Sequence, residues 1–277
     1  YRVQAFACTR YKATWRKMQR MNDATTEGAP LVSVVMPAYN ARHYIQDAIC
    51  SLQEQTVKNW ELQVVDDCSQ DGTPQLLAQL AREDARIHPV YNEINRGAAA
   101  SRNLALDRCT GEYIAFLDAD DMWRPDKLAR QLEKAEATGT DIIYCSYAMV
   151  DASGRPCYPD FLVEETTDLD AMLGCNVFSC STVLLRRDAL ADRRFRTGFY
   201  HEDYVLWLEL LQAGCTAAGI SDVLADYRIV DNSRSHDKAK SALHRWRIYR
   251  RYLNLPLGKS LSAFFRYAAG GLKKYSA

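Results

Sequence analysis

The sequence predicts an α/β protein with a mainly parallel sheet that helices cover on both faces. Apolar, β-branched runs alternate with segments of helical spacing, which is the pattern of successive β-α-β units. Two acidic clusters, within residues 66–71 and 118–121, each follow such a strand-like run. Ligands of open parallel sheets bind beyond the carboxyl ends of the strands, so these clusters predict a binding site at that edge.

The elements follow from local patterns. Residues 31–36 form a β-branched run that stops at Pro37, which predicts the first strand. Pro74 suits the first position of a helix, and Gly214 suits the end of another. Residues 151–180 are less regular and predict a lid or an acceptor-side loop. By the same criteria we expect helices over 42–55, 74–83, 98–108, 126–138, 203–213 and 238–253, and strands over 61–65, 88–91, 112–117, 141–150 and 181–185.

The formal net charge of zero hides an asymmetry. Residues 1–30 hold six Lys and Arg against two acidic residues, and residues 238–277 hold ten against none. We therefore expect a basic N-terminal extension (1–30), a central domain (31–230) and a basic amphipathic helical tail (231–277). Basic helices with aromatic residues favour an anionic membrane surface. The alternative is that the tail packs on the central domain with a solvated basic face.

The nine cysteines form no CxxC pair and lie mostly in apolar segments, as reduced core cysteines do. This pattern favours the cytoplasm. No apolar run reaches the ~18 to 20 residues of a membrane helix, and no signal peptide is visible. We expect a cytoplasmic protein, soluble or peripheral, with the inner face of the cell membrane as its docking surface. No nucleic-acid recognition motif accompanies the basic ends, so nucleic acid is not an expected partner.

The second acidic cluster has the chemistry of a cation site. Asp118 and Asp120 are two residues apart, so on an extended strand end they face the same way at about 6.6 Å along the chain. One Mg²⁺ or Mn²⁺ with a diphosphate fits this gap, because hard cations select oxygen ligands. The alternative is a solvated acidic turn in which Asp121 caps the helix that follows.

The first acidic cluster imitates a calcium loop. Asp67, Ser69, Asp71 and Gly72 match the first half of an EF-hand, but Ala78 stands where its bidentate Glu belongs and a strand precedes the loop. We exclude that interpretation. The alternative interpretation is a turn whose Asp and Ser side chains cap the next helix, and this role is compatible with ligand binding. Asp66 and Asp67 point to opposite sides, so we expect at most one of them to contact a base or ribose.

Four ordered motifs now stand together: ValSerValValMetProAlaTyrAsn (32–40), ValValAspAspCysSerGlnAspGlyThr (64–73), AsnArgGly with SerArgAsn (95–103), and LeuAspAlaAspAsp (117–121). In this order and spacing, from about Leu31 to Arg228, the chain resembles the family 2 glycosyltransferases, inverting enzymes of the GT-A fold. The tail that ends with GlyGlyLeuLysLysTyrSer (270–276) is similar to bacterial enzymes of teichuronic acid, lipopolysaccharide and capsular polysaccharide synthesis.

The resemblance implies roles in binding a UDP-sugar. Pro37, Ala38, Tyr39 and Asn40 would line the nucleotide pocket, with Ala38 and Tyr39 at the uracil. Asp66 and Asp67 would also lie at the nucleotide, and of these two Asp67 would hydrogen-bond the base. Arg102 would stand beside the nucleotide, Asp118 near the ribose or diphosphate, and Asp120 on the Mn²⁺ or Mg²⁺. Without the resemblance, Tyr39 is equally compatible with core packing and Arg102 with a surface salt bridge.

A further acidic pair, Glu202 and Asp203, begins the helix expected near residue 203. Carboxylates there stabilise a helix N-terminus, and capping alone would explain them. The resemblance makes Asp203 the general base that deprotonates an acceptor hydroxyl, with Glu202 as the reserve base or a group that holds the acceptor. A base of this kind must be ionised and within about 3 Å of the hydroxyl.

Two departures refine the analogy. Processive members carry a Gln/Arg-x-x-Arg-Trp motif and transmembrane segments; neither occurs here, so we expect the transfer of one sugar at a time. Related sequences often have His near Tyr227–Val230, where this chain has none, and His236 is a metal or phosphate ligand or, more simply, a solvated loop residue.

The sequence thus predicts an inverting, metal-dependent transferase that moves one sugar from a UDP-sugar to a bacterial surface-glycan acceptor, lipid-linked at the membrane. The alternative is a non-catalytic membrane adaptor that retains the sugar-nucleotide fold. A nucleotidyltransferase would need a Gly-rich, Arg-bearing loop after the first strand, and a Rossmann oxidoreductase would need GxGxxG there. ProAlaTyrAsn (37–40) is neither.

Overall fold

The computed structural model describes residues 30–230 and 238–274. Residues 1–29 of the expected N-terminal extension, His236 and the last three residues lie outside the described residues.

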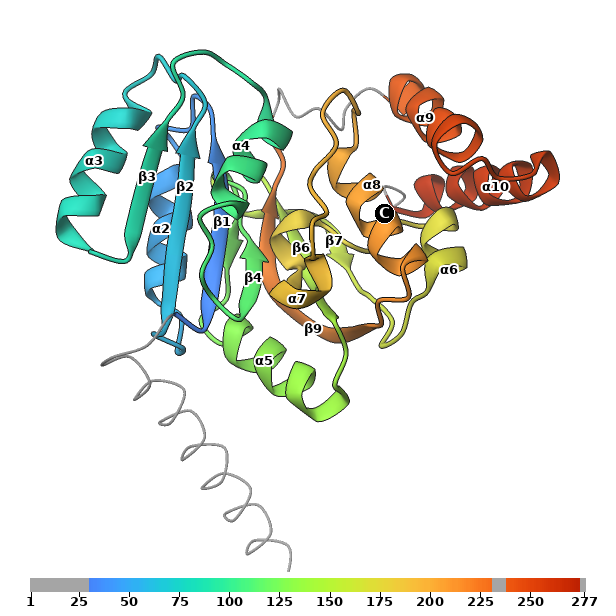
Figure 1. Ribbon diagram of the computed structural model, residues 1–277, viewed down its shortest axis with the longest axis horizontal. Helices are drawn as coiled ribbons and strands as arrows, with labels where there is room; N and C mark the ends of the chain where they lie inside the picture. The colour runs from blue at the N-terminus through green and yellow to red at the C-terminus, as the bar shows by residue number, and fades with distance from the viewer. Residues whose placement is uncertain (1–29, 231–237, 275–277) are drawn as a thin grey trace, which may run out of the picture.

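A single sheet of nine strands forms the centre of the molecule (Figure 1). Its strand order is β3-β2-β1-β4-β8-β6-β9-β5, with β7 added beside β6. β3, β2, β1 and β4 run parallel, as the sequence predicts. β8 runs antiparallel to both of its neighbours, so the other end of the sheet is mixed. The strands are β1 (Val32–Ala38), β2 (Trp60–Asp66), β3 (Ile87–Tyr91), β4 (Tyr113–Phe116), β5 (Met122–Trp123), β6 (Ile142–Val150), β7 (Pro156–Phe161), β8 (Leu184–Arg186) and β9 (Ala217–Arg228).

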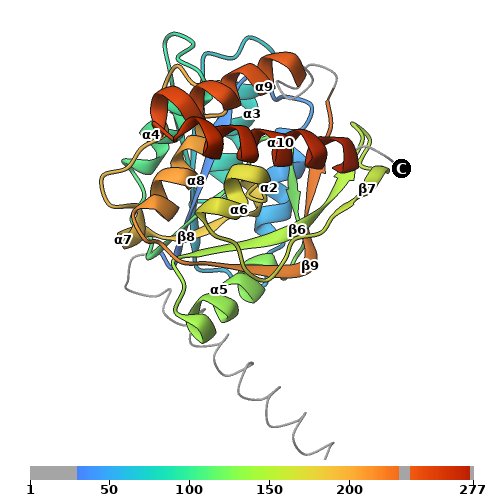
Figure 2. The same ribbon diagram turned by 90° about the vertical axis from the view of Figure 1, so that its right-hand side faces the viewer.

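Helices cover both faces of this sheet, as expected. Val34 and Met36 of β1 pack into a core that includes residues of α2, α3 and α5, whereas Val35 packs into a core formed with α4, α6 and α8. Figure 2 shows α6, α8 and α10 in front of β6 and β9. The helices are α2 (Ile45–Gln53), α3 (Thr73–Glu83), α4 (Ala98–Leu106), α5 (Lys127–Thr138), α6 (Leu169–Gly174), α7 (Arg187–Leu190), α8 (Glu202–Gln212), α9 (Lys238–Arg247) and α10 (Leu257–Lys274), with a 3₁₀ turn η2 (Cys180–Thr182) and a π-helical segment η4 (Ile248–Tyr252).

The differences from expectation lie in the second half of the chain. The strand expected over 181–185 divides into η2 and the short β8, and the irregular region 151–180 contains β7 and α6. The long strand β9 is absent from the sequence-based prediction. Its pairing with β6 shifts register twice, and exposed Ser221 and Asp222 interrupt its apolar pattern. A strand that bulges in this way loses the strict alternation by which strands are recognised.

The C-terminal helices pack near α6 and α8, at the end of the molecule opposite α3 and β3 (Figure 1). Ile248 and Tyr249 are buried in the same core as α8, and the Tyr249 hydroxyl donates to the Leu173 carbonyl oxygen. Arg266 of α10 lies 3.0 Å from Asp170 of α6. Within residues 30–230 and 238–274, no helix combines the length and apolar character that crossing a membrane requires.

Candidate active site

The carboxyl ends of β1, β2 and β4 meet at one edge of the sheet, and most of the predicted site residues gather there. Pro37 and Ala38 end β1, with Ala38 buried. Tyr39 follows with 53% of its surface exposed, so it is a rim residue and does not pack in the core. The backbone N–H of Asn40 donates to Ser69 Oγ at 2.8 Å, and Asn40 Oδ1 accepts from the Gln70 N–H. These bonds tie the loop after β1 to the loop after β2.

Asp66 and Asp67 point in different directions, as predicted. Asp66 Oδ2 accepts from the Ser69 N–H at 3.0 Å, whereas Asp67 accepts from the N–H groups of Arg96 and Gly97 at 2.9 and 2.7 Å. Gly97 has a φ of +83°, a conformation that glycine adopts without strain. Burial alone would raise the pKa of Asp67, but these hydrogen bonds lower it below its usual range. The ionised carboxylate thus holds the loop that leads into α4.

Arg102 of α4 connects the two ends of the candidate site. Its guanidinium lies 2.6 Å from Asp118 Oδ1 and 3.0 Å from Glu202 Oε1, and the side chain is buried. Burial would lower the pKa of Arg102, but Asp118 and Glu202 raise it further above its ordinary value. The sequence left a surface salt bridge open for this arginine; the structure instead shows a buried bridge between a sheet-edge turn and the start of α8.

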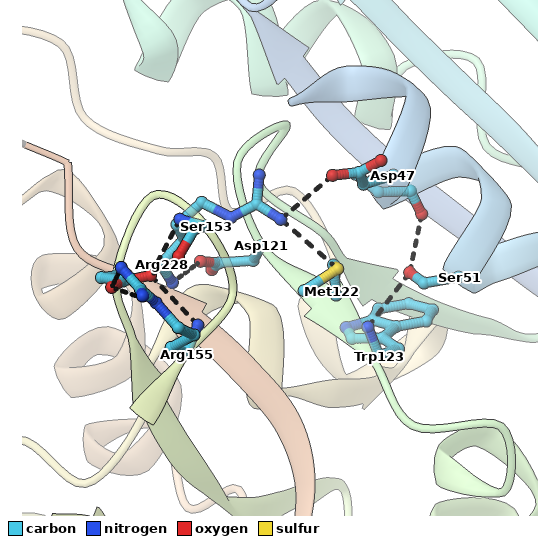
Figure 3. Close-up of polar contacts among 10 residues, drawn as sticks. Asp47, Ser51, Asp121, Met122, Trp123, Ser153, Arg155 and Arg228 are labelled. Atoms are coloured by element: carbon cyan, nitrogen blue, oxygen red, sulfur yellow. Dashed lines mark hydrogen bonds and ion pairs between the residues drawn. The ribbon is translucent and has the colours of Figure 1, made fainter. Parts of the chain in front are cut away.

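The acidic turn after β4 presents its three aspartates differently. Burial and the neighbouring Asp118 raise the pKa of Asp120 to about 6. Asp121 is fully buried and points away, where its carboxylate accepts from Ser181 Oγ at 2.5 Å and from the Arg228 N–H at 2.9 Å. Figure 3 shows Asp121 turned toward the end of β9, with the Arg228 side chain reaching past Met122 to Asp47. The alternative interpretation, in which Asp121 caps the next helix, is therefore not what the structure shows, because its carboxylate binds η2 and β9.

A divalent cation fits the remaining pair, Asp118 and Asp120. Their mutual repulsion raises the proton affinity of Asp120, and a cation between them would relieve it. Across the described part of the chain, no group of three or more His, Cys, Asp or Glu side chains is arranged to hold a metal. A cation here would therefore complete its shell with phosphate oxygens and water, which is how Mg²⁺ is commonly bound.

Glu202 and Asp203 begin α8 beside this turn. Glu202 is buried in its ion pair with Arg102, whereas Asp203 is partly exposed, and no ion pair to it is found among the described residues. Burial raises the pKa of Asp203, and Arg102 partly offsets this effect. Of the two carboxylates, Glu202 is therefore the one that Arg102 holds in an ion pair, and Asp203 is the more exposed.

Sequence reasoning missed two residues that hold the site together. Ser181 accepts from the Asp118 N–H at 3.1 Å and donates to Asp121, and the Arg228 N–H binds Asp121. Ser181 begins the segment 181–185 that the sequence predicts to be a strand, and a serine at a strand end does not by itself indicate a functional residue. Arg228 is the last residue of β9, a strand that the pattern did not predict.

Comparison with known proteins shows to which family the chain belongs. The family model of glycosyl transferase family 2 matches residues 33–194. The chain is 40% identical over 249 residues to the teichuronic acid biosynthesis glycosyltransferase TuaG of Bacillus subtilis, covering 90% of this chain and 99% of TuaG. The chain belongs to glycosyltransferase family 2. A second family member, the Escherichia coli enzyme named UDP-Glc:alpha-D-GlcNAc-diphosphoundecaprenol beta-1,3-glucosyltransferase WfgD, is 33% identical, with coverage of 89% and 95%.

Solved structures confirm the GT-A fold expected of a family 2 glycosyltransferase. S. aureus TarS 1–349 in complex with UDP-GlcNAc matches with a TM-score of 0.67 at 21% identity, over 86% of this chain and 71% of that one. The mannosyltransferase PcManGT from Pyrobaculum calidifontis, in complex with GDP-Man and Mn²⁺, matches with a TM-score of 0.65 at 19% identity, over 99% and 86%.

Proposed function

We propose that this family 2 glycosyltransferase moves one sugar at a time, with inversion, from a UDP-sugar to a hydroxyl of a lipid-linked bacterial surface-glycan precursor. The bridge through Arg102 is the observation that carries the proposal, because it joins the acidic turn to the start of α8, where Asp203 lies. The names of TuaG and WfgD support a surface glycan and a lipid-linked acceptor, and the UDP-GlcNAc complex of TarS supports the donor class.

On the donor side, Tyr39 offers an exposed aromatic face for the uracil, with Pro37, Ala38 and Asn40 around it. Asp67 already accepts three hydrogen bonds, from Asn92, Arg96 and Gly97. The Ser101 side chain also stabilises the charged form of this carboxylate. We propose that the same ionised group accepts the imide N–H of the base. Asp118 and Asp120 would hold Mn²⁺ or Mg²⁺, which when bound neutralises charge on the departing diphosphate.

On the acceptor side, Asp203 takes the proton of the acceptor hydroxyl as its oxygen attacks the anomeric carbon. The bond from that carbon to the diphosphate oxygen breaks, and UDP leaves with the electron pair. Attack and departure occur on opposite faces of the sugar, so the configuration inverts. Arg102 fixes Glu202 away from the hydroxyl and steadies the start of α8, which positions Asp203.

The decisive experiment compares Asp203→Asn with wild type for Mn²⁺-dependent UDP binding by calorimetry and for transfer or hydrolysis across a panel of UDP-sugars. We expect UDP affinity within about threefold of wild type and a loss of turnover of at least about 10²-fold, because the base is removed and the donor pocket is not. The matched control, Asp170→Asn, changes an aspartate in the first turn of α6 that pairs with Arg266. It should retain both functions.

Retained turnover in Asp203→Asn would reject this base. Wild-type protein that binds UDP but neither transfers nor hydrolyses any sugar would favour the adaptor alternative. Binding of a different nucleotide in preference to UDP would keep the fold and reject the donor.

We place the reaction in the cytoplasm at the inner membrane face, where α10 offers a docking surface. Leu257, Leu261 and Phe265 are 56%, 41% and 69% exposed and recur every four residues, so they form one apolar stripe. Exposed Lys259 and Arg266 lie on the same helix, and residues 238–277 contain no acidic residue. Lys259 and Arg266 pair with Asp170 of α6, so the docking surface is the apolar stripe itself, on a segment that carries basic and no acidic residues.

Sedimentation with vesicles tests this surface. Wild type should bind phosphatidylglycerol-containing vesicles more tightly than phosphatidylcholine vesicles, and Leu261→Ser/Phe265→Ser should weaken that binding at least ~tenfold by removing buried apolar area. Leu162→Ser is the control, since Leu162 is 68% exposed outside α10. Equal binding by the double variant and wild type would reject the α10 surface.

A further inference from the structure

The acidic turn is held from its buried side by two hydrogen bonds that meet at one hydroxyl. Ser181 Oγ accepts from the Asp118 N–H at 3.1 Å and donates to Asp121 Oδ2 at 2.5 Å. Ser181 and Asp121 are 2% and 1% exposed. The hydroxyl therefore connects the first and last residues of the segment that carries Asp118 and Asp120.

The same residues attach the turn to two further elements. The Trp123 indole N–H donates to the Ser181 carbonyl oxygen at 2.7 Å, which anchors η2 beside β5. On the other side, Asp121 Oδ1 accepts from the Arg228 N–H at 2.9 Å, so the turn is also bound to the end of β9 (Figure 3). Both carboxylate oxygens of Asp121 are thus occupied, one by Ser181 of η2 and the other by the Arg228 N–H at the end of β9.

We propose that Ser181 and Asp121 are positioning residues that set the distance and direction of Asp118 and Asp120 toward the cation and diphosphate of the donor. This inference rests on the proposed function. Neither residue touches the substrate; each acts through the turn. Groups that orient metal ligands in this way commonly change metal affinity by about 10- to 100-fold when they are removed.

If the Ser181 hydroxyl served only to stabilise the fold, its removal would affect UDP binding no more than the removal of any other buried hydroxyl. The neighbouring Thr182 provides that comparison. Thr182 is as buried as Ser181, and its hydroxyl donates to the Ser179 carbonyl oxygen at 2.7 Å, within its own segment. Thr182→Val thus removes a buried hydroxyl from the same turn of η2 without touching a bond to the acidic turn.

The test uses the full chain as wild type, Ser181→Ala, Ser181→Thr and Thr182→Val. UDP binding is measured by calorimetry with and without Mn²⁺, beside thermal unfolding of each protein. We expect Ser181→Ala to weaken Mn²⁺-dependent UDP binding by about 10- to 100-fold while metal-free UDP binding stays within about threefold. Ser181→Thr keeps a hydroxyl at this position and should retain most of the Mn²⁺-dependent UDP binding that Ser181→Ala loses. Thr182→Val should lower the unfolding temperature but keep the Mn²⁺ dependence.

The inference would be overturned by Mn²⁺-dependent binding by Ser181→Ala equal to that of wild type, or by a loss of binding that Thr182→Val shares in proportion to its lower stability. Wild type that binds UDP without any effect of Mn²⁺ would also overturn it, while leaving the UDP donor intact. Wild type that binds no UDP at all would remove the proposed donor and the inference together.

Discussion

The aspartates of the site differ in proton affinity because their neighbours differ. Backbone N–H groups of Arg96 and Gly97 lower the pKa of Asp67, whereas burial and Asp118 raise that of Asp120 to about 6. Burial likewise raises the pKa of Asp203, with Arg102 acting against it. Groups with one chemistry are thereby suited to different tasks: Asp67 stays charged and organises a loop, and in the proposed mechanism Asp120 would bind a cation and Asp203 would accept a proton.

At this scale we predict an acid limb in the rate of sugar transfer. A general base works only when deprotonated, so kcat at saturating donor and metal should fall as the pH drops through the raised pKa of Asp203. The midpoint should lie above the ordinary value of 3.8. The measurement is the pH profile of kcat, with protein stability followed in parallel. A kcat that stays constant as the pH is lowered to 3.8 would contradict the assignment of Asp203 as the base.

Among the elements, β9 lies in close contact with the backbone of the segment before α6 at one residue, Gly219. Its Gly219 N–H donates to the Glu165 carbonyl oxygen at 2.8 Å, and a Cβ on Gly219 would meet the Glu164 carbonyl oxygen at 2.1 Å and the Tyr144 ring at 2.9 Å. Only a residue without a side chain fits there, so this glycine permits the segment before α6 to cross β9.

We therefore predict that Gly219→Ala lowers the free energy of unfolding by about 1 to 3 kcal/mol, because backbone must move to admit the methyl group. Urea denaturation measures the change. Gly258→Ala in α10, where a Cβ would meet nothing within 4 Å, should leave stability unchanged or slightly raised. A Gly219→Ala variant within about 0.5 kcal/mol of wild type would refute the steric argument.

In the molecule as a whole, the C-terminal helices share a hydrophobic core with α8 and β4. Ala263 of α10 is fully buried in the cluster that contains Trp207 of α8 and Phe116 of β4. Phe265, two residues further along, is largely exposed. The tail therefore has an inward face that stabilises the fold and an outward face available to a partner.

We expect Ala263→Asp to lower the free energy of unfolding by at least about 3 kcal/mol, since it buries an unpaired charge. Phe265→Ser should remain within about 0.5 kcal/mol of wild type, as surface substitutions usually do. Chemical denaturation followed by tryptophan fluorescence and circular dichroism measures both. If Ala263→Asp were as stable as wild type, α10 would not be part of this core.

Local patterns were sufficient for the first half of the fold and for most of the candidate site. The runs before Pro37, Asp66 and Asp118 are short and mainly apolar, and the ends of adjacent parallel strands meet at one edge. Their polar residues therefore converge without knowledge of the rest of the chain. In the second half, the bulged strand β9 lacks a regular period and was not predicted, and β8 was predicted only as part of a longer strand over 181–185.

The residue types and their order thus establish the family, the α/β architecture and the acidic edge of the sheet, because these depend on contacts and spacings within short segments. Folding decides the rest. Arg102 meets Glu202 across 100 residues, and Ser181 meets Asp121 across 60. Which carboxylate is paired, which is buried and which is left to accept a proton depends on such long-range contacts, and no local pattern encodes them.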